Sequence, residues 1–196
     1  ALVPLETKED WTKSLQGLSL KNVSLSFRNG KKVIYEGFGE MMFTHFGITG
    51  PLVLSASSYV VDLIKHKELR LVIDLKPALD EQKLDQRMLR DLEQYQNRTI
   101  ENALQDLYPR TLIPIMAERA GISPDTQANS VTKQQRRALV ELLKNFTVKI
   151  SRKRPVAEAI ITSGGIKVSE VDPRTMESKL VKGLYFAGEI LDCDAY

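Results

Sequence analysis

Apolar residues repeat with different periods along this chain of 196 residues, and that change limits the folds it can adopt. Residues 18–27 and 146–150 alternate apolar and polar side chains, which is typical of half-buried strands. Between them apolar residues recur at helical spacing, at Leu84, Met88, Leu89, Leu92, Leu139, Leu142 and Leu143. The sequence therefore predicts an α+β fold: a β-barrel-like subdomain with an inserted small helical subdomain.

Boundaries follow from the same patterns. We expect the first part of the β-rich subdomain over residues 1–78, the helical subdomain over 79–145, and the second β-rich part over 146–182. Pro109, Pro114 and Pro124 should divide the middle into several short helices. The outer segments are expected to share one sheet or barrel.

Local signals predict individual elements. Asn29-Gly30 separates the strand at 18–27 from residues 32–35 and indicates a tight hairpin, because type I′ turns need positive φ at both central residues. Glycines between 37 and 50 favour a loop, and Pro51 suits the first turn of a helix over 52–64. Further strands are expected over 69–75, 156–162, 166–171 and 183–189.

Composition is that of a globular protein, with 42% hydrophobic and 27% charged residues. No apolar run approaches the roughly 18 residues that a membrane span needs, so we expect no membrane association. Cys193 is the only cysteine, which excludes an internal disulfide and any cysteine-rich metal site. We expect a cytoplasmic protein without a metal centre.

Two basic stretches lie close together in the sequence, although the net charge is only +3. Either they form one basic face that binds nucleic acid or another anion, or they are a solvated helix face and a charged loop. The candidate residues for binding an anion are Arg136, Arg137, Arg152, Lys153 and Arg154.

His45 is the candidate catalytic residue that the residue types suggest, with Thr44 beside it. A histidine in a glycine-bounded loop before a helix N-terminus can donate a proton, while Thr44 and free helix N–H groups hold an anionic portion of the substrate. The alternative is that His45 only anchors the loop by hydrogen bonding.

Several ordered motifs frame the whole chain. They are G-E-M-M-F-T-H-F-G-I-T-G-P at 39–51, T-S-G-G-I at 162–166, E-V-D-P-R-T-M-E-S-K at 170–179 and G-L-Y-F-A-G-E-I-L-D at 183–192. Together they resemble the YhiN/BaiN-type FAD-dependent flavoproteins. The helical middle is similar to that family only in general character.

The resemblance implies that this chain is the insert of a longer two-dinucleotide-fold flavoprotein, with residues 183–196 a truncated return strand of its FAD-binding domain. The rest of that domain would be its partner, FAD its cofactor, and NADH or NADPH the electron donor. Thr162, Gly164 and Gly165 would lie near the flavin ring or the domain hinge. Phe186, Ala187, Gly188 and Glu189 would lie against the ribityl–pyrophosphate region.

In such an oxidoreductase the insert would cover the flavin and select a substrate, either a small molecule or a uracil in ribosomal RNA that becomes dihydrouridine. The basic stretches favour RNA. The sequence contains no G-x-G-x-x-G, so the phosphate-binding loop would have to lie elsewhere, and this chain alone is not expected to be active. The alternative is a non-enzymatic binding or structural module. The oligomeric state is left open.

Overall fold

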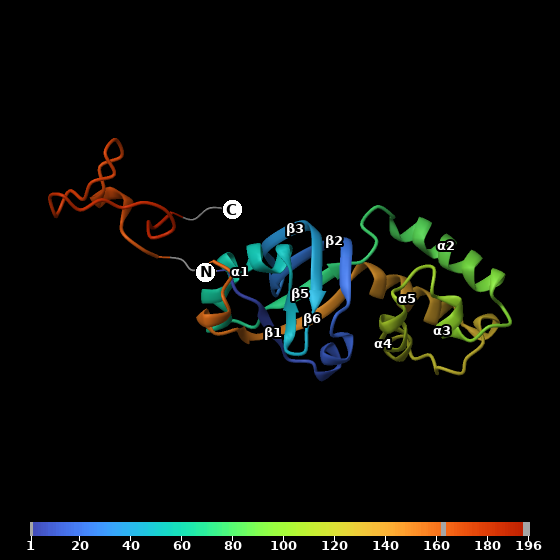
Figure 1. Ribbon diagram of the computed structural model, residues 1–196. Helices are drawn as coiled ribbons and strands as arrows, with labels where there is room; N and C mark the ends of the chain where they lie inside the picture. Colours follow the sequence, from blue (N-terminus) through green and yellow to red (C-terminus); the bar gives the residue numbers. More distant parts are fainter. Residues whose placement is uncertain (1, 162–163, 194–196) are drawn as a thin grey trace.

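A barrel forms the centre of the molecule, with helices on one side and an extended arm on the other (Figure 1). This computed structural model describes residues 2–161 and 164–193. We refer to residues 81–144 as the helical lobe and to the described part of residues 156–193 as the C-terminal arm.

Within the described residues, six antiparallel strands close into a barrel in the order β1-β4-β3-β2-β5-β6. Strand β1, the first in sequence, pairs directly with β6, the last. Segments that precede and follow the helical lobe in the sequence therefore share one sheet. This confirms the predicted α+β class with a barrel. The strands are β1 (Leu5–Thr7), β2 (Ser19–Asn29), β3 (Lys32–Phe43), β4 (Gly47–Thr49), β5 (Arg70–Asp74) and β6 (Phe146–Lys153).

The predicted hairpin joins β2 and β3. The turn itself is shifted by one residue from the prediction: Asn29 is the last residue of β2 and pairs with Lys32, so Gly30 and Lys31 are the central residues. Of these only Gly30 has positive φ, at 57°, so the expected pair of positive-φ residues at Asn29 and Gly30 is wrong.

The loop expected between 37 and 50 is wrong over most of its length, because β3 continues to Phe43 and Gly47–Thr49 form β4, which leaves residues 44–46 as the turn between them. Gly37 lies within this strand, where it marks close packing and not a turn. A Cβ there would lie only 3.0 Å from a methyl group of Leu52, so the absence of a side chain lets the following helix pack closely.

That helix is α1 (Pro51–Ile64), and it begins at the proline as predicted. Gly50 is the N-cap, with φ 102° and its backbone against Met41, where a Cβ would lie 2.9 Å from the Met41 Cα. Val53, Ala56 and Val60 are buried on the helix face turned to the barrel.

The helical lobe contains α2 (Glu81–Gln94), α3 (Ile100–Ala103), α4 (Ile113–Arg119) and α5 (Lys133–Lys144). Asp80 caps α2 by accepting a hydrogen bond from the Lys83 N–H, and Thr132 forms a capping box with Gln135 on α5. Leu84, Met88 and Leu92 are buried as expected, whereas Leu89 is 39% exposed. Leu89 lies off the stripe because the buried residues are spaced four apart and it is five from Leu84.

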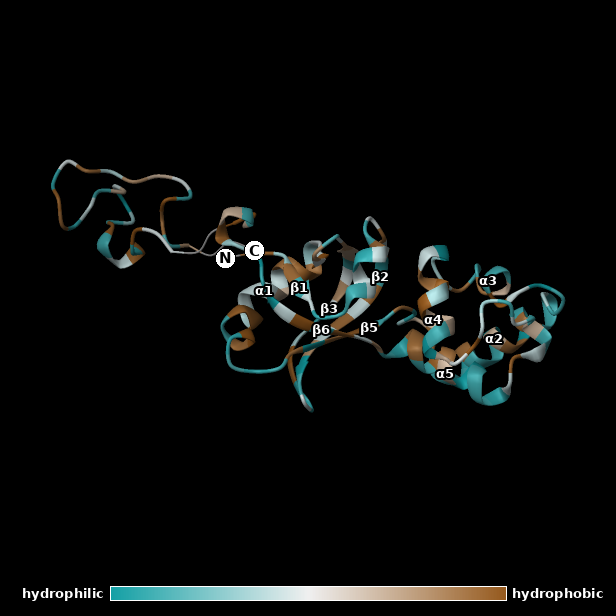
Figure 2. Cartoon of the chain, turned by 90° about the horizontal axis from the view of Figure 1, so that it is seen from below, coloured by the Kyte–Doolittle hydropathy of each residue, from teal (hydrophilic) through white to brown (hydrophobic). Residues whose placement is uncertain are grey.

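Buried side chains run continuously from the barrel into the helical lobe, and hydrophobic residues occur in the strands of the barrel and in the helices of the lobe (Figure 2). Two cations join the parts. The Arg119 guanidinium lies 4.4 Å from the centroid of the Trp11 ring and 4.9 Å from that of Phe146. The Lys144 ammonium contacts the Asp74 carboxylate at 2.6 Å and donates to the carbonyls of Lys76 and Leu79.

The C-terminal arm departs from the sequence prediction. The strands expected over 156–162, 166–171 and 183–189 are not formed in its described residues, which contain short 3-10 helices at Val156–Glu158 and Val168–Glu170 and isolated bridges. A strand needs a neighbour to pair its backbone groups, and the described residues supply only single pairs, such as Glu177 with Tyr185. Among the described residues, no helix has the length and apolar character to cross a membrane.

Candidate functional site

Two glycine-containing segments of the C-terminal arm lie side by side. The Ile166 N–H donates to the Ile190 carbonyl at 2.9 Å, and the Asp192 N–H donates back to the Ile166 carbonyl at 2.9 Å. Gly165 makes this approach possible, because a Cβ at this position would lie 2.4 Å from the Ile190 oxygen. The structure therefore brings Gly164 and Gly165 next to the segment that carries Glu189.

The turn at Ala187, Gly188 and Glu189 is exposed to solvent. Gly188 has φ 81°, and no atom lies within 4 Å of the position its Cβ would occupy. Phe186 is half-buried and its N–H donates to the Met176 carbonyl at 3.0 Å. Within the described part of the chain, Glu189 has no ion-pair partner. The backbone and carboxylate of this turn are thus accessible to a ligand.

A compact loop supports that turn. Its polar side chains bind backbone N–H groups: Asp172 accepts from Arg174 at 2.8 Å, and Glu177 accepts from Gly183 at 2.7 Å. These positioning roles were not predicted from the sequence. Asp172-Pro173 is a pair typical of turns, and an aspartate that accepts from the N–H two residues later is the usual signature of such turns.

Thr162, the other residue expected near the flavin, lies outside the described residues. Cys193 is exposed. No group of three or more His, Cys, Asp or Glu that is suited to a metal ion occurs among the residues the structure describes.

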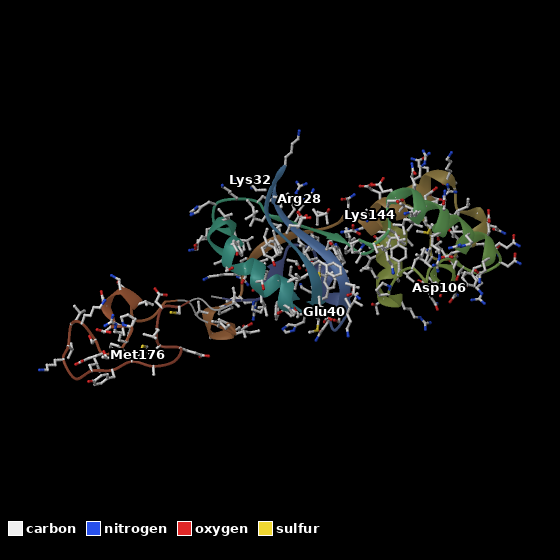
Figure 3. The ribbon with its side chains drawn as sticks, turned by 90° about the horizontal axis from the view of Figure 1, so that it is seen from above. Arg28, Lys32, Glu40, Asp106, Lys144 and Met176 are labelled. Atoms are coloured by element: carbon white, nitrogen blue, oxygen red, sulfur yellow. The ribbon has the colours of Figure 1, made fainter. Side chains whose placement is uncertain are left out.

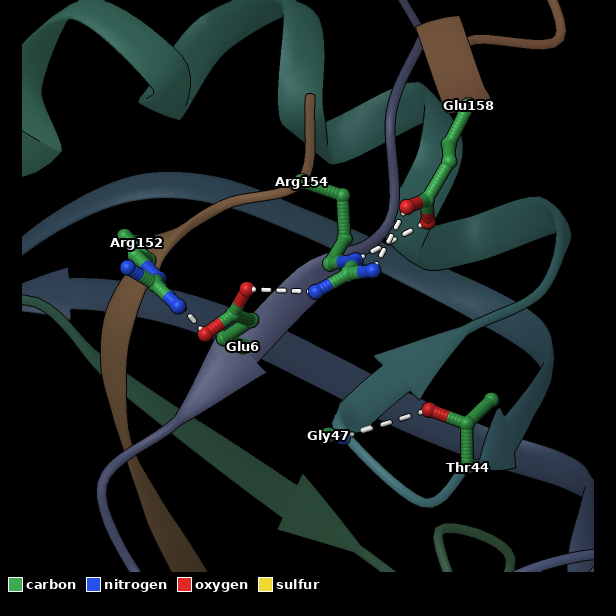
Figure 4. Close-up of polar contacts among 6 residues, drawn as sticks. All are labelled: Glu6, Thr44, Gly47, Arg152, Arg154 and Glu158. Carbon is green, nitrogen blue, oxygen red and sulfur yellow. Dashed lines mark hydrogen bonds and ion pairs between the residues drawn. The ribbon is translucent and has the colours of Figure 1, made fainter. Parts of the chain in front are cut away.

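The candidate catalytic pair lies in the turn between β3 and β4. Thr44 accepts a hydrogen bond from the Gly47 N–H at 3.2 Å, so its hydroxyl stabilises the turn (Figure 4). His45 is exposed, and its ring centroid lies 4.9 Å from that of Phe46. The expected position before a helix N-terminus is wrong, because β4 separates this turn from α1.

An ion-pair network lies where the arm leaves the barrel (Figure 4). Glu6 on β1 accepts from the Arg152 Nε at 2.6 Å and from the Arg154 Nη1 at 2.8 Å. Arg154 also binds both carboxylate oxygens of Glu158 and stacks on Phe46, with 4.6 Å between the guanidinium carbon and the ring centroid. Because Arg154 binds both Glu6 on β1 and Glu158 in the arm, it holds the start of the arm against β1.

The same contacts set the ionisation of the network. Burial raises the pKa of the Glu6 carboxyl, but hydrogen bonds and charge from Arg152 and Arg154 outweigh this effect and lower the pKa below its usual range. Hydrogen bonds from Arg154 likewise lower the pKa of Glu158, and the nearby charge of His45 acts in the same direction. Both carboxyl groups are held in the ionised form.

The two predicted basic stretches are not brought together. Arg136 on α5 forms a two-pronged contact with Asp85 on α2, at 2.8 and 3.0 Å, inside the helical lobe. Arg152 and Arg154 lie at the far end of β6 and bind carboxylates there. Figure 1 shows α5 and the end of β6 in different parts of the molecule. Arg137 is exposed beside Asp85, and Lys153 is half-buried.

A closed barrel that carries a helical lobe is the architecture this chain shares with a known family. Residues 1–161 match the family described as "HI0933-like protein barrel and H2TH domain", so the chain belongs to that family. This confirms the family that the sequence motifs predicted.

Three relatives are similar to this chain. A 3-dehydro-bile acid delta(4,6)-reductase of Clostridium scindens is 28% identical over 84% of this chain and 41% of that protein. A ribosomal RNA dihydrouridine synthase of Escherichia coli is 29% identical over 78% of this chain and 36% of that protein. One of the same name from Haemophilus influenzae is 28% identical over 98% of this chain and 45% of that protein. The chain thus spans less than half the length of these relatives.

Proposed function

We propose that this chain is the substrate-side insert of a flavin-dependent oxidoreductase, where it covers FAD and selects the substrate. The observation that carries the proposal is the apolar surface of the C-terminal arm. Among its described apolar residues only Val171 is buried, whereas these are exposed: Val156, Ile160, Ile161, Val168, Leu180, Val181, Leu184, Tyr185 and Ile190. Exposed apolar surface of this kind marks an interaction site. We infer that the rest of an FAD-binding domain covers the arm.

The residues of the arm fit one wall of a dinucleotide site. Gly188 presents open backbone, and the exposed Glu189 carboxylate is available to accept hydrogen bonds from ribityl or ribose hydroxyls. Gly164 and Gly165 lie beside this turn. The phosphates would be held elsewhere, because the chain contains no glycine-rich fingerprint for them.

When bound, FAD supplies hydride transfer from NADH or NADPH to an unsaturated substrate. In this proposal Glu189 orients the cofactor through its hydroxyl groups, and the barrel excludes water from the reacting atoms. His45, exposed on the β3–β4 turn, delivers a proton from an imidazole nitrogen to the substrate. Thr44 has a positioning role, because its hydroxyl already accepts from Gly47.

We propose a uracil in ribosomal RNA as the substrate. Two of the relatives are named as synthases of dihydrouridine in that RNA. The third is named for a bile acid derivative, so a small-molecule substrate is the second candidate. Exposed cations on the barrel favour RNA, since phosphate groups are the natural partners of such a surface.

Flavin content tests the cofactor part of this proposal. The full-length protein should purify yellow and release flavin on denaturation, and Glu189→Ala should lower its flavin occupancy. Glu101→Ala is the matched control, because Glu101 is an exposed carboxylate on α3. A colourless full-length protein, or a Glu189→Ala variant with unchanged flavin and unchanged activity, would contradict the proposal.

Mass spectrometry tests the substrate. Ribosomal RNA from cells without the gene should lack one dihydrouridine that returns when the full-length gene is restored. Turnover of a steroid-like enone with no change in the RNA would support the small-molecule candidate instead.

A further inference from the structure

Three cations stand directly opposite one another on neighbouring strands of the barrel. Arg28 on β2 pairs in register with Arg70 on β5, and Arg70 pairs in register with Lys149 on β6. Directly opposed residues of antiparallel strands project from the same face of the sheet. That face is the outer one, because the neighbours Phe27, Leu71 and Val148 are buried in the core. We refer to Arg28, Arg70 and Lys149 as the basic row.

More cations extend the row at both ends. Lys31 and Lys32 are exposed at the tip of the β2–β3 hairpin beside Arg28, and Figure 3 shows Arg28 and Lys32 at the same end of the barrel. At the other end, the Lys8 N–H donates to the Lys149 carbonyl. Adjacent strands lie about 4.8 Å apart, so these cations form a closely spaced line.

In the part of the chain that the structure describes, Lys149 is the one member of the basic row with a carboxylate within ion-pair distance. Glu36 and Asp74 share the outer face farther along β2, opposite Ser26 and Ser24, and Asp74 is paired with Lys144. Glu68 lies 3.9 Å from the Lys8 ammonium and 4.0 Å from that of Lys149, and the Glu9 carboxylate accepts from the Lys149 backbone N–H. Among the described residues, no carboxylate is within ion-pair distance of Arg28 or Arg70. Like charges directly opposite each other destabilise a sheet. A bound polyanion would relieve that repulsion.

An aromatic pocket lies on the same outer face. Phe38 on β3 stands opposite Ser24, and Ser24 lies four residues, or about 13 Å, along β2 from Arg28. Its side chain is 63% exposed and lines a pocket of 590 Å³ together with Lys21, Lys76 and Pro77. An exposed aromatic ring beside cations is the combination on which unpaired bases stack while their phosphates are held. A lipid surface would not need such a pocket.

We propose that the basic row binds the phosphate backbone of single-stranded RNA and that Phe38 stacks on one of its bases. This surface is distinct from the stretches at Arg136 and Arg152, whose guanidinium groups bind carboxylates of the chain itself. The proposal rests on the ribosomal RNA substrate proposed above, and places recognition of the strand on the barrel, away from the C-terminal arm.

Anisotropy of a labelled single-stranded RNA, titrated with the full-length protein at several salt concentrations, tests the proposal. Arg28→Gln/Arg70→Gln should weaken binding about tenfold or more and reduce the slope of log K against log salt by roughly 1.4, since each phosphate contact contributes about 0.7. Phe38→Ala should weaken binding roughly five- to 100-fold with little change in slope. Phe38→Ala should not lower Tm, because the ring is exposed. Loss of the hydrogen bond from the Arg28 Nε to the Ser26 hydroxyl should lower the Tm of the double variant by only about 2–4 °C.

Arg90→Gln/Arg110→Gln is the control with equal charge loss, since both arginines are exposed in the helical lobe. Equal weakening by the two double variants, unchanged binding in Arg28→Gln/Arg70→Gln, or binding only to anionic vesicles would overturn the proposal. Flavin content of the same proteins separates the two ideas. If the protein is colourless but its RNA binding depends on the basic row, only the proposed oxidoreductase function is contradicted. If the protein is yellow but its RNA binding does not depend on the basic row, only the proposed RNA-binding surface is contradicted.

Discussion

At the scale of single residues, His45 is the candidate proton donor, and its side chain is exposed to solvent at a defined place in the fold. It lies on the β3–β4 turn beside Phe46, close to the network that holds the arm against the barrel. If it donates the proton, His45→Gln should lower turnover by about 100-fold or more, because general acid catalysis contributes that much. Flavin content should not change. Full turnover in His45→Gln would leave the histidine only the role of an anchor for the turn.

Glu6 governs a dependence of stability on pH. Its pKa in the folded state lies below the ordinary value of 4.5, so the network contributes stability above pH 4.5 that is lost as the pH falls through the lowered pKa. Glu6→Gln should unfold at lower urea concentration than the parent chain at neutral pH. The difference should shrink as the pH falls below about 4.5.

Urea unfolding followed by circular dichroism measures this effect. Glu101→Gln serves as the control, because it removes an exposed carboxylate that has no ion-pair partner among the described residues. A difference between Glu6→Gln and the parent chain that stays constant with pH would show that the charge of Glu6 is not what stabilises the network.

At the scale of elements, closure of the barrel depends on Gly47. A Cβ here would lie 2.4 Å from the Leu5 carbonyl oxygen and 2.8 Å from the Thr7 nitrogen, at a φ of 154°. Gly47→Ala should therefore separate β4 from β1 and lower the free energy of unfolding by roughly 3 kcal/mol or more. Gly30→Ala, with φ 57° and no atom within 4 Å, should lower it by about 1 kcal/mol. Equal losses in thermal unfolding would contradict this account.

Elements defined by local chemistry were predictable from the sequence. The hairpin between β2 and β3 and the start of α1 at Pro51 follow from backbone preferences of two or three residues, although the turn is centred on Gly30 and Lys31, one residue later than predicted. The extension of β3 through Gly37 was not predictable, because the glycine serves contact with Leu52 rather than a turn.

The candidate site divides in the same way. The glycine motifs at 164–165 and 187–189 could be recognised in the sequence. Their proximity, through the hydrogen bonds between Ile166 and Ile190, could not be predicted and is found only in the structure. The ion pairs of Arg152 and Arg154 could not be predicted from the sequence, because their partner Glu6 is more than 140 positions away. The basic row was equally hidden, because the register of β2, β5 and β6 is set by tertiary pairing.

At the scale of the whole molecule, the barrel and the helical lobe share one core while the arm has almost none of its own. Limited trypsin digestion of this 196-residue chain should therefore cut first in the arm, at Lys167, Arg174, Lys179 or Lys182, and leave a resistant product containing α5 and β6. In the full-length protein the same sites should be protected. First cleavage within the helical lobe would contradict this division of the chain.

In the proposed function, the turn at Ala187, Gly188 and Glu189 faces a flavin dinucleotide that is held by another part of a longer protein. A structure of the full-length protein, solved by crystallography or electron microscopy with FAD added, tests this arrangement directly. We predict density for the ribityl or pyrophosphate portion against this backbone, with the Glu189 carboxylate within hydrogen-bonding distance of a hydroxyl. Density elsewhere, with the turn packed beneath protein side chains, would contradict the proposal.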